Sequence, residues 1–140
     1  MPRFETGIDI ASCRAVVWRL ITDAQSYPEW NSTVLRVEGV IEPAAGIRVV
    51  TTADPTHGHG VKVVEFEPEN RMVWRGGLPL GLFTGSRTFL LGDSDKGVRF
   101  EMAEDYSGPL AFAIGRTLPD LQPMFDAFAA DLRAAAEASQ

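Results

Sequence analysis

Cysteine is almost absent from this chain of 140 residues, since Cys13 is the only one. No disulfide can therefore form within the chain. Cys13 stands near the start of an expected helix with no base beside it in sequence, and we expect it to be a buried packing residue. A GxSxG nucleophile motif and a phosphate-binding glycine loop are also missing. These absences argue against a disulfide-stapled fold, a serine hydrolase and a nucleotide-binding protein.

Positive charge is in short supply and is dispersed. The chain has 13 Lys and Arg residues against 19 Asp and Glu residues, which gives a net charge of −6. The basic residues occur singly along the sequence, whereas a nucleic-acid-binding protein needs a basic patch that meets the phosphate backbone. We therefore predict no nucleic-acid partner.

Long hydrophobic runs are missing as well. No stretch approaches the roughly 20 apolar residues that a membrane-spanning helix needs. The first residues, MPRFETGIDI, lack the apolar run of a signal peptide. We therefore expect no stable membrane insertion and a cytoplasmic location. The length predicts a single domain over residues 1–140.

The most informative segment is the amphipathic stretch 118–137. Leu121, Phe125, Phe128 and Leu132 recur at spacings of three and four, so they share one face of an expected helix. If Asp120 is the N-cap, Pro123 falls in the first turn, where a proline is tolerated. A helix with two phenylalanines on one face must bury that face against something else.

Short strands fill most of the chain before this helix. Alternating or β-branched residues between turn-forming residues predict them. The expected strands cover residues 3–10, 34–41, 47–52, 61–67, 71–76, 85–92 and 98–106. Two short helices, over residues 12–22 and 23–27, follow the first strand, a third short helix begins near residue 109, and residues 54–60 are expected to form a loop. The predicted fold class is α+β, with a curved antiparallel sheet of about seven strands wrapped around the long C-terminal helix.

Several motifs resemble one known family. They are Val17–Asp23, Tyr27–Asn31, Glu65–Pro68, Met72–Gly76 and Tyr106–Gly108. Together with the order of elements they resemble the polyketide cyclase/dehydrase branch of the START-like (SRPBCC) superfamily. The resemblance implies a helix-grip fold and an apolar ligand held between sheet and helix. That superfamily includes lipid carriers, aromatase/cyclases, hormone receptors and co-chaperone-like domains, so the fold does not by itself fix the activity.

Large apolar residues are the candidates for the wall of such a cavity. The expected ligand-binding residues are Trp30, Trp74, Phe83, Phe89, Phe100, Met102, Met124, Phe125 and Phe128. A ligand pocket is mostly apolar with a few convergent polar groups. The alternative for each of these residues is that it simply fills the core, as aromatic residues usually do.

Three polar residues are candidates for chemistry within that wall. By the two-residue period of a strand, Glu104 and Tyr106 continue the face of Phe100 and Met102, and Arg87 shares a face with Phe89. Glu104 would be a general acid or base, Arg87 would pair with it or hold a ligand oxygen, and Tyr106 would donate a proton. The alternative is that Glu104 lies in water at the strand end and Arg87 is a surface charge.

Metal and cofactor binding are not expected. His57 and His59 lie two residues apart near Asp54, but the segment is rich in glycine and no further histidine is available as a zinc ligand. We expect no metal and no cofactor, and a solvated loop here.

Three functions remain open. The leading one is a non-catalytic carrier or sensor of a small hydrophobic molecule such as a lipid, isoprenoid or polyketide. The second is an aromatase/cyclase-type enzyme acting on a polyketide-like substrate, with positioning as a main source of acceleration. The third is a protein-interaction module. The apolar segments Leu78–Phe83 and Leu110–Ile114 could gate a cavity or form a dimer surface, so the protein is expected to be a monomer or a homodimer.

Overall fold

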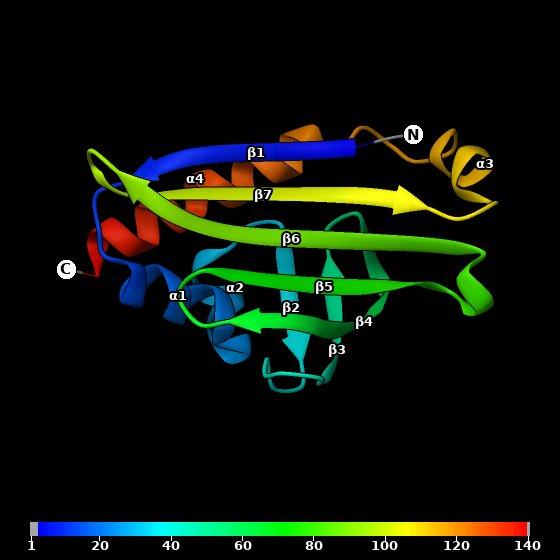
Figure 1. Cartoon of the computed structure of the whole chain (residues 1–140), viewed down its shortest axis with the longest axis horizontal. Helices are drawn as coiled ribbons and strands as arrows, with labels where there is room; N and C mark the ends of the chain where they lie inside the picture. Colours follow the sequence, from blue (N-terminus) through cyan, green and yellow to red (C-terminus); the bar gives the residue numbers. More distant parts are fainter. Residues whose placement is uncertain (1–2, 140) are drawn as a thin grey trace.

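The computed structural model describes residues 3–139 and contains one seven-stranded antiparallel sheet. The strands lie in the order β1-β7-β6-β5-β4-β3-β2, and α4 crosses one face of the sheet (Figure 1). The strands are β1 (Arg3–Ile10), β2 (Val34–Glu38), β3 (Gly46–Thr51), β4 (Asp54–Glu67), β5 (Arg71–Leu78), β6 (Phe83–Ser94) and β7 (Gly97–Ser107). The helices are α1 (Arg14–Thr22), η1 (Ala24–Ser26), α2 (Tyr27–Trp30), η2 (Pro79–Gly81), α3 (Ala111–Gly115) and α4 (Gln122–Ala138). The predicted helix-grip fold is confirmed.

The predicted loop over residues 54–60 is wrong, because β4 already begins at Asp54. Its first half pairs with β3, where Val49 faces His59 and Arg48 faces Gly60. The register shifts between Val49 and Thr51, and Gly58 adopts a φ of +72° that favours glycine. Pairing with a neighbouring strand therefore overrides the turn-like composition of this segment.

Two local expectations at helix starts also need correction. Helix α1 begins at Arg14 with Cys13 as its N-cap, and Cys13 is exposed. The buried stripe of α1 starts only at Val17, one turn later, so the N-cap position stays at the surface. The N-cap of α4 is Leu121, although Asp120 Oδ1 still accepts a hydrogen bond from the Gln122 backbone N–H at 3.0 Å.

The core lies between the sheet and the helices α1, α2 and α4. Phe125, Phe128 and Leu132 of α4 are buried against the inner face of the sheet, which we define as the side facing α4. Carboxylates on the flanks of α4 fix its position, because Asp126 accepts a hydrogen bond from Thr6 of β1 and Asp131 accepts one from the Ser32 backbone. No helix in residues 3–139 is long and apolar enough to cross a membrane.

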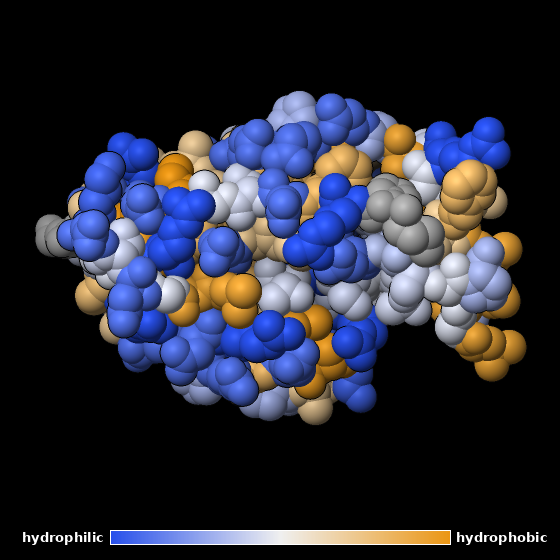
Figure 2. Space-filling model, turned by 45° about the horizontal axis from the view of Figure 1, so that its top comes forward, coloured by the Kyte–Doolittle hydropathy of each residue, from blue (hydrophilic) through white to orange (hydrophobic). Residues whose placement is uncertain are grey.

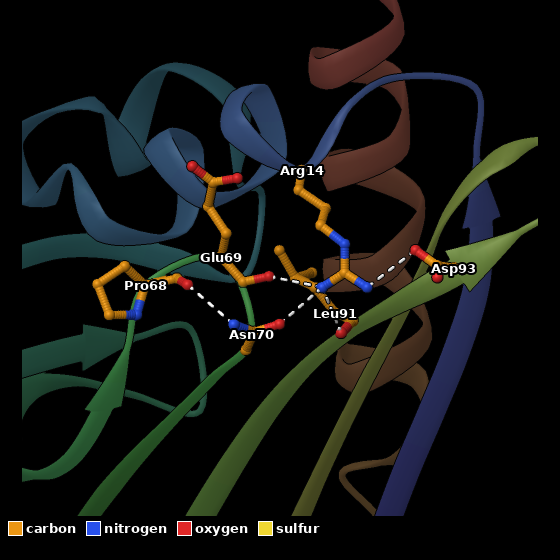
Figure 3. A network of polar contacts seen from close by, with 6 residues as sticks. All are labelled: Arg14, Pro68, Glu69, Asn70, Leu91 and Asp93. Atoms are coloured by element: carbon orange, nitrogen blue, oxygen red, sulfur yellow. Dashed lines mark hydrogen bonds and ion pairs between the residues drawn. The ribbon is translucent and has the colours of Figure 1, made fainter.

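Arg14 ties the start of α1 to the β4–β5 turn and to the end of strand β6 (Figure 3). Its Nη1 donates to the carbonyl oxygens of Glu69 and Leu91 at 2.8 and 3.1 Å and to Asn70 Oδ1 at 3.0 Å. Its Nη2 lies 3.0 Å from Asp93 Oδ1. One guanidinium thus joins α1, the β4–β5 turn and β6, because its planar fork carries five donors.

We expect Arg14→Met to lower the free energy of unfolding by about 2–3 kcal/mol. The methionine keeps the apolar stem but leaves the Glu69 and Leu91 carbonyls without this donor. Urea denaturation of the purified variant measures the loss. The matched control is Arg19→Met on the same helix, where the side chain is exposed and a change within about 0.5 kcal/mol is expected. Equal stability of both variants would show that the network contributes nothing.

Candidate functional site

An ion pair between two strands is the polar centre of the inner face. Arg87 of β6 stands directly opposite Glu104 of β7, and its Nε donates to Glu104 Oε1 at 3.0 Å. The two side chains are only 16% and 17% exposed. A pair this sheltered interacts far more strongly than one at the surface, but it also loses most of its hydration.

Tyr106 completes the polar group, two residues after Glu104 on the same face. Its hydroxyl donates to Glu104 Oε2, so the carboxylate accepts from a phenol and a guanidinium at once. The three residues that the sequence placed on one face therefore form one connected cluster.

Aromatic rings surround this cluster. The Arg87 guanidinium lies 4.8 Å from the centroid of Phe125 on α4, a cation–π distance. Phe83 stacks on Tyr106 with ring centroids 5.5 Å apart, and Phe4 meets Tyr106 edge-on at 6.4 Å. The cluster is thus a polar spot in an apolar wall.

Phe4 is a wall residue that the sequence analysis did not single out. It lies opposite Glu104 in the β1–β7 pairing and also contacts Phe125 at 5.8 Å. The sequence does contain a signal for this position, because Phe4 alternates with polar residues on the first strand. In a helix-grip order the first strand lies next to the last strand, which carries Glu104 and Tyr106.

The pKa of each of the two tyrosines is raised. For Tyr106 the main cause is burial, followed by the negative charge of Glu104. For Tyr27 the cause is also burial, which the positive charge of Arg87 partly offsets. The Tyr27 hydroxyl donates to the Ile21 carbonyl at 2.7 Å. Both phenols therefore stay protonated in the folded protein at a pH where a free tyrosine ionises.

We expect the free energy of unfolding to fall above about pH 10. A group whose pKa is raised by folding contributes its full stability below the unfolded pKa and loses it as pH rises beyond that value. The loss approaches about 1.4 kcal/mol per pH unit for each tyrosine. Because the chain has only two tyrosines, tyrosinate absorbance should appear together with unfolding, and Tyr106→Phe should make the pH dependence shallower. Tyrosinate absorbance well before unfolding would contradict this.

The other candidate ligand-binding residues pack closely together. Phe89, Phe100, Met102 and Phe128 are fully buried, and the rings of Phe100 and Phe128 stack with centroids 6.1 Å apart. Trp74 meets Phe89 edge-on at 4.7 Å. These residues occupy the space between sheet and α4 as core, while Phe83, Met124 and Trp30 are only partly buried.

Two buried indole N–H groups in this region lack a hydrogen-bond acceptor. They are Trp30 Nε1 and Trp74 Nε1, and no atom in the described part of the chain accepts a hydrogen bond from either. Both rings lie beside Tyr27, at centroid distances of 5.0 and 6.2 Å. A buried donor without an acceptor is costly, so these two N–H groups are places where an oxygen-bearing ligand would be favoured. Sequence alone shows an indole but not whether its N–H finds a partner.

Two surface hollows lie elsewhere, on the outer face of the sheet, which is the side facing away from α4. One, of about 560 Å³, is lined by alternating charges such as Arg3, Arg99, Glu101 and Asp105. The other, of about 640 Å³, crosses β3, β4 and β5. Their charged linings set both apart from the apolar interior.

The paired histidines do not form a metal site with other ligands in the structure. Within residues 3–139, no three His, Cys, Asp or Glu side chains stand close enough together to hold a metal ion. His57 instead interacts with Asp54, and its backbone N–H is the main reason that the pKa of Asp54 is lowered.

Comparison with known proteins gives one family match. A family model described as "Polyketide cyclase / dehydrase and lipid transport" matches residues 1–137. Among curated proteins, none matches the sequence.

Solved structures with the same fold come from several bacteria. A hypothetical protein of Helicobacter pylori has a TM-score of 0.77 and 17% identity, over 96% of this chain and 88% of its own. A Rhodobacter sphaeroides protein has a TM-score of 0.76 and 17% identity, over 99% and 93%. A START superfamily protein from Mycobacterium smegmatis has a TM-score of 0.69 and 12% identity, over 99% of each chain. At these identities the likeness concerns the fold alone.

Proposed function

The chain belongs to the polyketide cyclase/dehydrase and lipid transport family, and on that premise we propose that it binds a small hydrophobic ligand between the sheet and α4, as a carrier or sensor. The apolar part of the ligand would lie against Phe4, Phe83 and Phe125. Its polar end would meet the Nη1 and Nη2 groups of Arg87, since the Tyr106 hydroxyl already donates to Glu104.

The observation that carries this proposal is the polar cluster inside an aromatic wall. A sheltered ion pair is weak support for stability, because apolar residues of similar size often stabilise a protein as well or better. A few convergent polar groups in an apolar surround are instead typical of a small-molecule site. Ligand binding therefore explains the placement of Arg87, Glu104 and Tyr106 better than a contribution to the stability of the fold does.

Around Arg87 the free hydrogen-bond donors outnumber the free acceptors, and this indicates which polar group the ligand carries. Arg87 uses Nε for Glu104, and the described residues give Nη1 and Nη2 no hydrogen-bond acceptor. The indoles of Trp30 and Trp74 add two more donors. We therefore propose a ligand that carries a carbonyl or carboxylate oxygen on an apolar body.

A second function, catalysis on a polyketide-like substrate, is favoured by one detail. Tyr106 and Arg87 both bond to Glu104, so a proton donor, a cation and a carboxylate lie within one hydrogen-bonded group. Glu104 would remove a proton next to a ketone, and Arg87 would stabilise the resulting enolate oxygen while the enolate carbon attacks a second carbonyl carbon of the substrate. Tyr106 would protonate the alkoxide that forms and regain a proton from Glu104, to which it is hydrogen-bonded. Aldol closure needs these roles.

Native mass spectrometry and a fluorescent probe test the binding function. We expect the protein as purified to retain a small organic molecule, and the stripped protein to bind anilinonaphthalene sulfonate, an aromatic anion. Arg87→Met should weaken probe binding about tenfold or more, because a charge-assisted hydrogen bond is lost. Arg19→Met is the matched control, since Arg19 is exposed on α1 and lines neither the polar cluster nor an anion-binding groove. No retained molecule and no binding of this probe or of a fatty acid would overturn the proposal.

A further inference from the structure

Two adjoining connections form an exposed apolar tip at one end of the molecule. We define the tip as residues 78–82, from the end of β5 to the start of β6, and residues 110–112, at the start of α3. Leu80 is 97% exposed and Phe112 is 65% exposed, and Leu78, Leu82 and Leu110 are also exposed. Figure 2 shows hydrophobic side chains gathered at this end, where α3 and the β5–β6 connection project in Figure 1. Large side chains exposed together in this way indicate an interaction surface.

The tip is held in place by its own backbone. The Leu110 N–H donates to the Leu82 carbonyl at 2.9 Å, which joins the two connections. A Cβ on Gly108, whose φ is +100°, would come within 2.6 Å of the Gly81 carbonyl oxygen. Leu80 adopts a left-handed backbone with a φ of 61°, a conformation that costs free energy for a residue other than glycine. The chain thus holds a leucine outward at an energetic cost.

The tip is free of negative charge in an otherwise acidic protein. Residues 77–86 and 106–119 contain no Asp or Glu, although the chain has 19 of them. The one charged residue in these two segments is Arg116, whose guanidinium lies 5.3 Å from the centroid of Phe112. An aromatic ring with a guanidinium beside it suits the boundary between apolar and charged surroundings.

A basic groove adjoins the tip along β5. It is the 640 Å³ hollow on the outer face, and its lining runs on to Gly77, the residue before Leu78. Three cations line it, namely Arg48, Lys62 and Arg75, against a single carboxylate. That carboxylate, Glu38, is already paired with Arg36 at 2.8 Å.

The cations of the groove stand close together, and the one carboxylate beside them is Glu38, which lies opposite Arg48 in the β2–β3 pairing. Lys62 lies directly opposite Arg75 in the β4–β5 pairing, an arrangement that disfavours folding because the charges repel. Within residues 3–139, neither of them nor Arg48 forms an ion pair. Glycines 46, 60, 76 and 77 share the lining, so little side-chain bulk separates an approaching anion from the three cations. The groove is suited to a phosphate group.

We propose that this end of the molecule docks on an anionic lipid bilayer. The tip inserts Leu80 and Phe112 among the acyl chains, and Arg48, Lys62 and Arg75 meet lipid phosphates beside it. Exposed apolar side chains with cations beside them suit a lipid interface, where binding scales with buried apolar area and with attraction to anionic headgroups. Charge complementarity favours an anionic surface, and distant carboxylates matter little beyond a Debye length of about 8 Å. The docking does not depend on the ligand between sheet and α4.

Vesicle flotation with the full chain tests this proposal. We expect binding to vesicles of phosphatidylcholine with one third phosphatidylglycerol, and much weaker binding to phosphatidylcholine alone. The double variant Leu80→Ser/Phe112→Ser should lose at least tenfold in affinity through lost apolar contact. Lys62→Glu/Arg75→Glu should lose at least tenfold on anionic vesicles, since each basic residue near such a surface contributes about fivefold.

Matched controls separate docking from general effects. Leu35→Ser removes an exposed leucine from β2, and Arg19→Glu reverses a charge on α1, at the opposite end from the tip (Figure 1). Both should bind vesicles like the wild type. Circular dichroism confirms that every variant is folded. Failure of the folded wild type to bind anionic vesicles, equal binding by the tip variant, or a dimer that Leu80→Ser dissociates would each overturn the proposal.

Discussion

Glu104→Ala should lower the free energy of unfolding by about 3 kcal/mol. The substitution leaves the sheltered guanidinium of Arg87 without its carboxylate and the Tyr106 hydroxyl without its acceptor. Breaking one side of a buried pair costs more than the pair itself contributes, because the remaining charge has lost its hydration and gained nothing in return. Urea denaturation at neutral pH, compared with the wild type, measures the loss.

Two further variants show where that loss comes from. Glu104→Gln keeps an oxygen that can accept from Arg87 or Tyr106 and should cost less than the alanine. The double variant Arg87→Met/Glu104→Leu replaces the pair by apolar residues of similar size and should recover most of the lost stability. If the double variant is as unstable as Glu104→Ala, the ion pair itself holds the sheet together, and the case for a binding role weakens.

The same double variant also separates folding from binding. If it is stable yet no longer binds an aromatic anion, the polar cluster is retained for a ligand. A loss of turnover in Glu104→Gln with unchanged probe binding would instead favour the enzyme. The two proposed functions therefore give different results with the same set of proteins.

The polar cluster could be predicted from sequence because strand geometry is simple. Side chains alternate between two faces, so Arg87 shares a face with Phe89, and Glu104 and Tyr106 share one with Met102. Pairing the two strands, β6 and β7, as a hairpin then places Arg87 next to Glu104. The same alternation predicted the helix-grip order, since α4 needs an apolar surface for Phe125 and Phe128.

Other features depend on contacts that no local pattern records. Arg14 looked like one of many scattered basic residues, because its partners are two backbone carbonyls far away in sequence. The basic groove depends on the register that puts Lys62 opposite Arg75. The start of β4 was missed because pairing with β3, including a register shift, outweighs the local signal of Gly and Pro.

Phe128→Ala should be the most destabilising change on the inner face, at about 3–5 kcal/mol. The ring is 1% exposed and meets Tyr27, Trp30, Phe89 and Phe100 at centroid distances of 6.2, 5.6, 6.2 and 6.1 Å. Its removal leaves an apolar void beneath α4. Urea denaturation measures the cost, and Phe112→Ala is the control, since that ring is exposed and should change stability by less than about 0.5 kcal/mol.

The void made by Phe128→Ala also tests how the interior takes up a ligand. An apolar void of this size binds a small aromatic molecule such as benzene, which should restore part of the lost stability, and the gain should rise with the logarithm of its concentration above the Kd. If benzene stabilises the wild type as well, space between sheet and α4 is already accessible to small molecules. A cost of less than about 1 kcal/mol for Phe128→Ala would contradict close packing around this ring. Stabilisation of the wild type by benzene would mean that a ligand enters without displacing the core, whereas stabilisation of the variant alone means that the closely packed rings must move before a ligand enters.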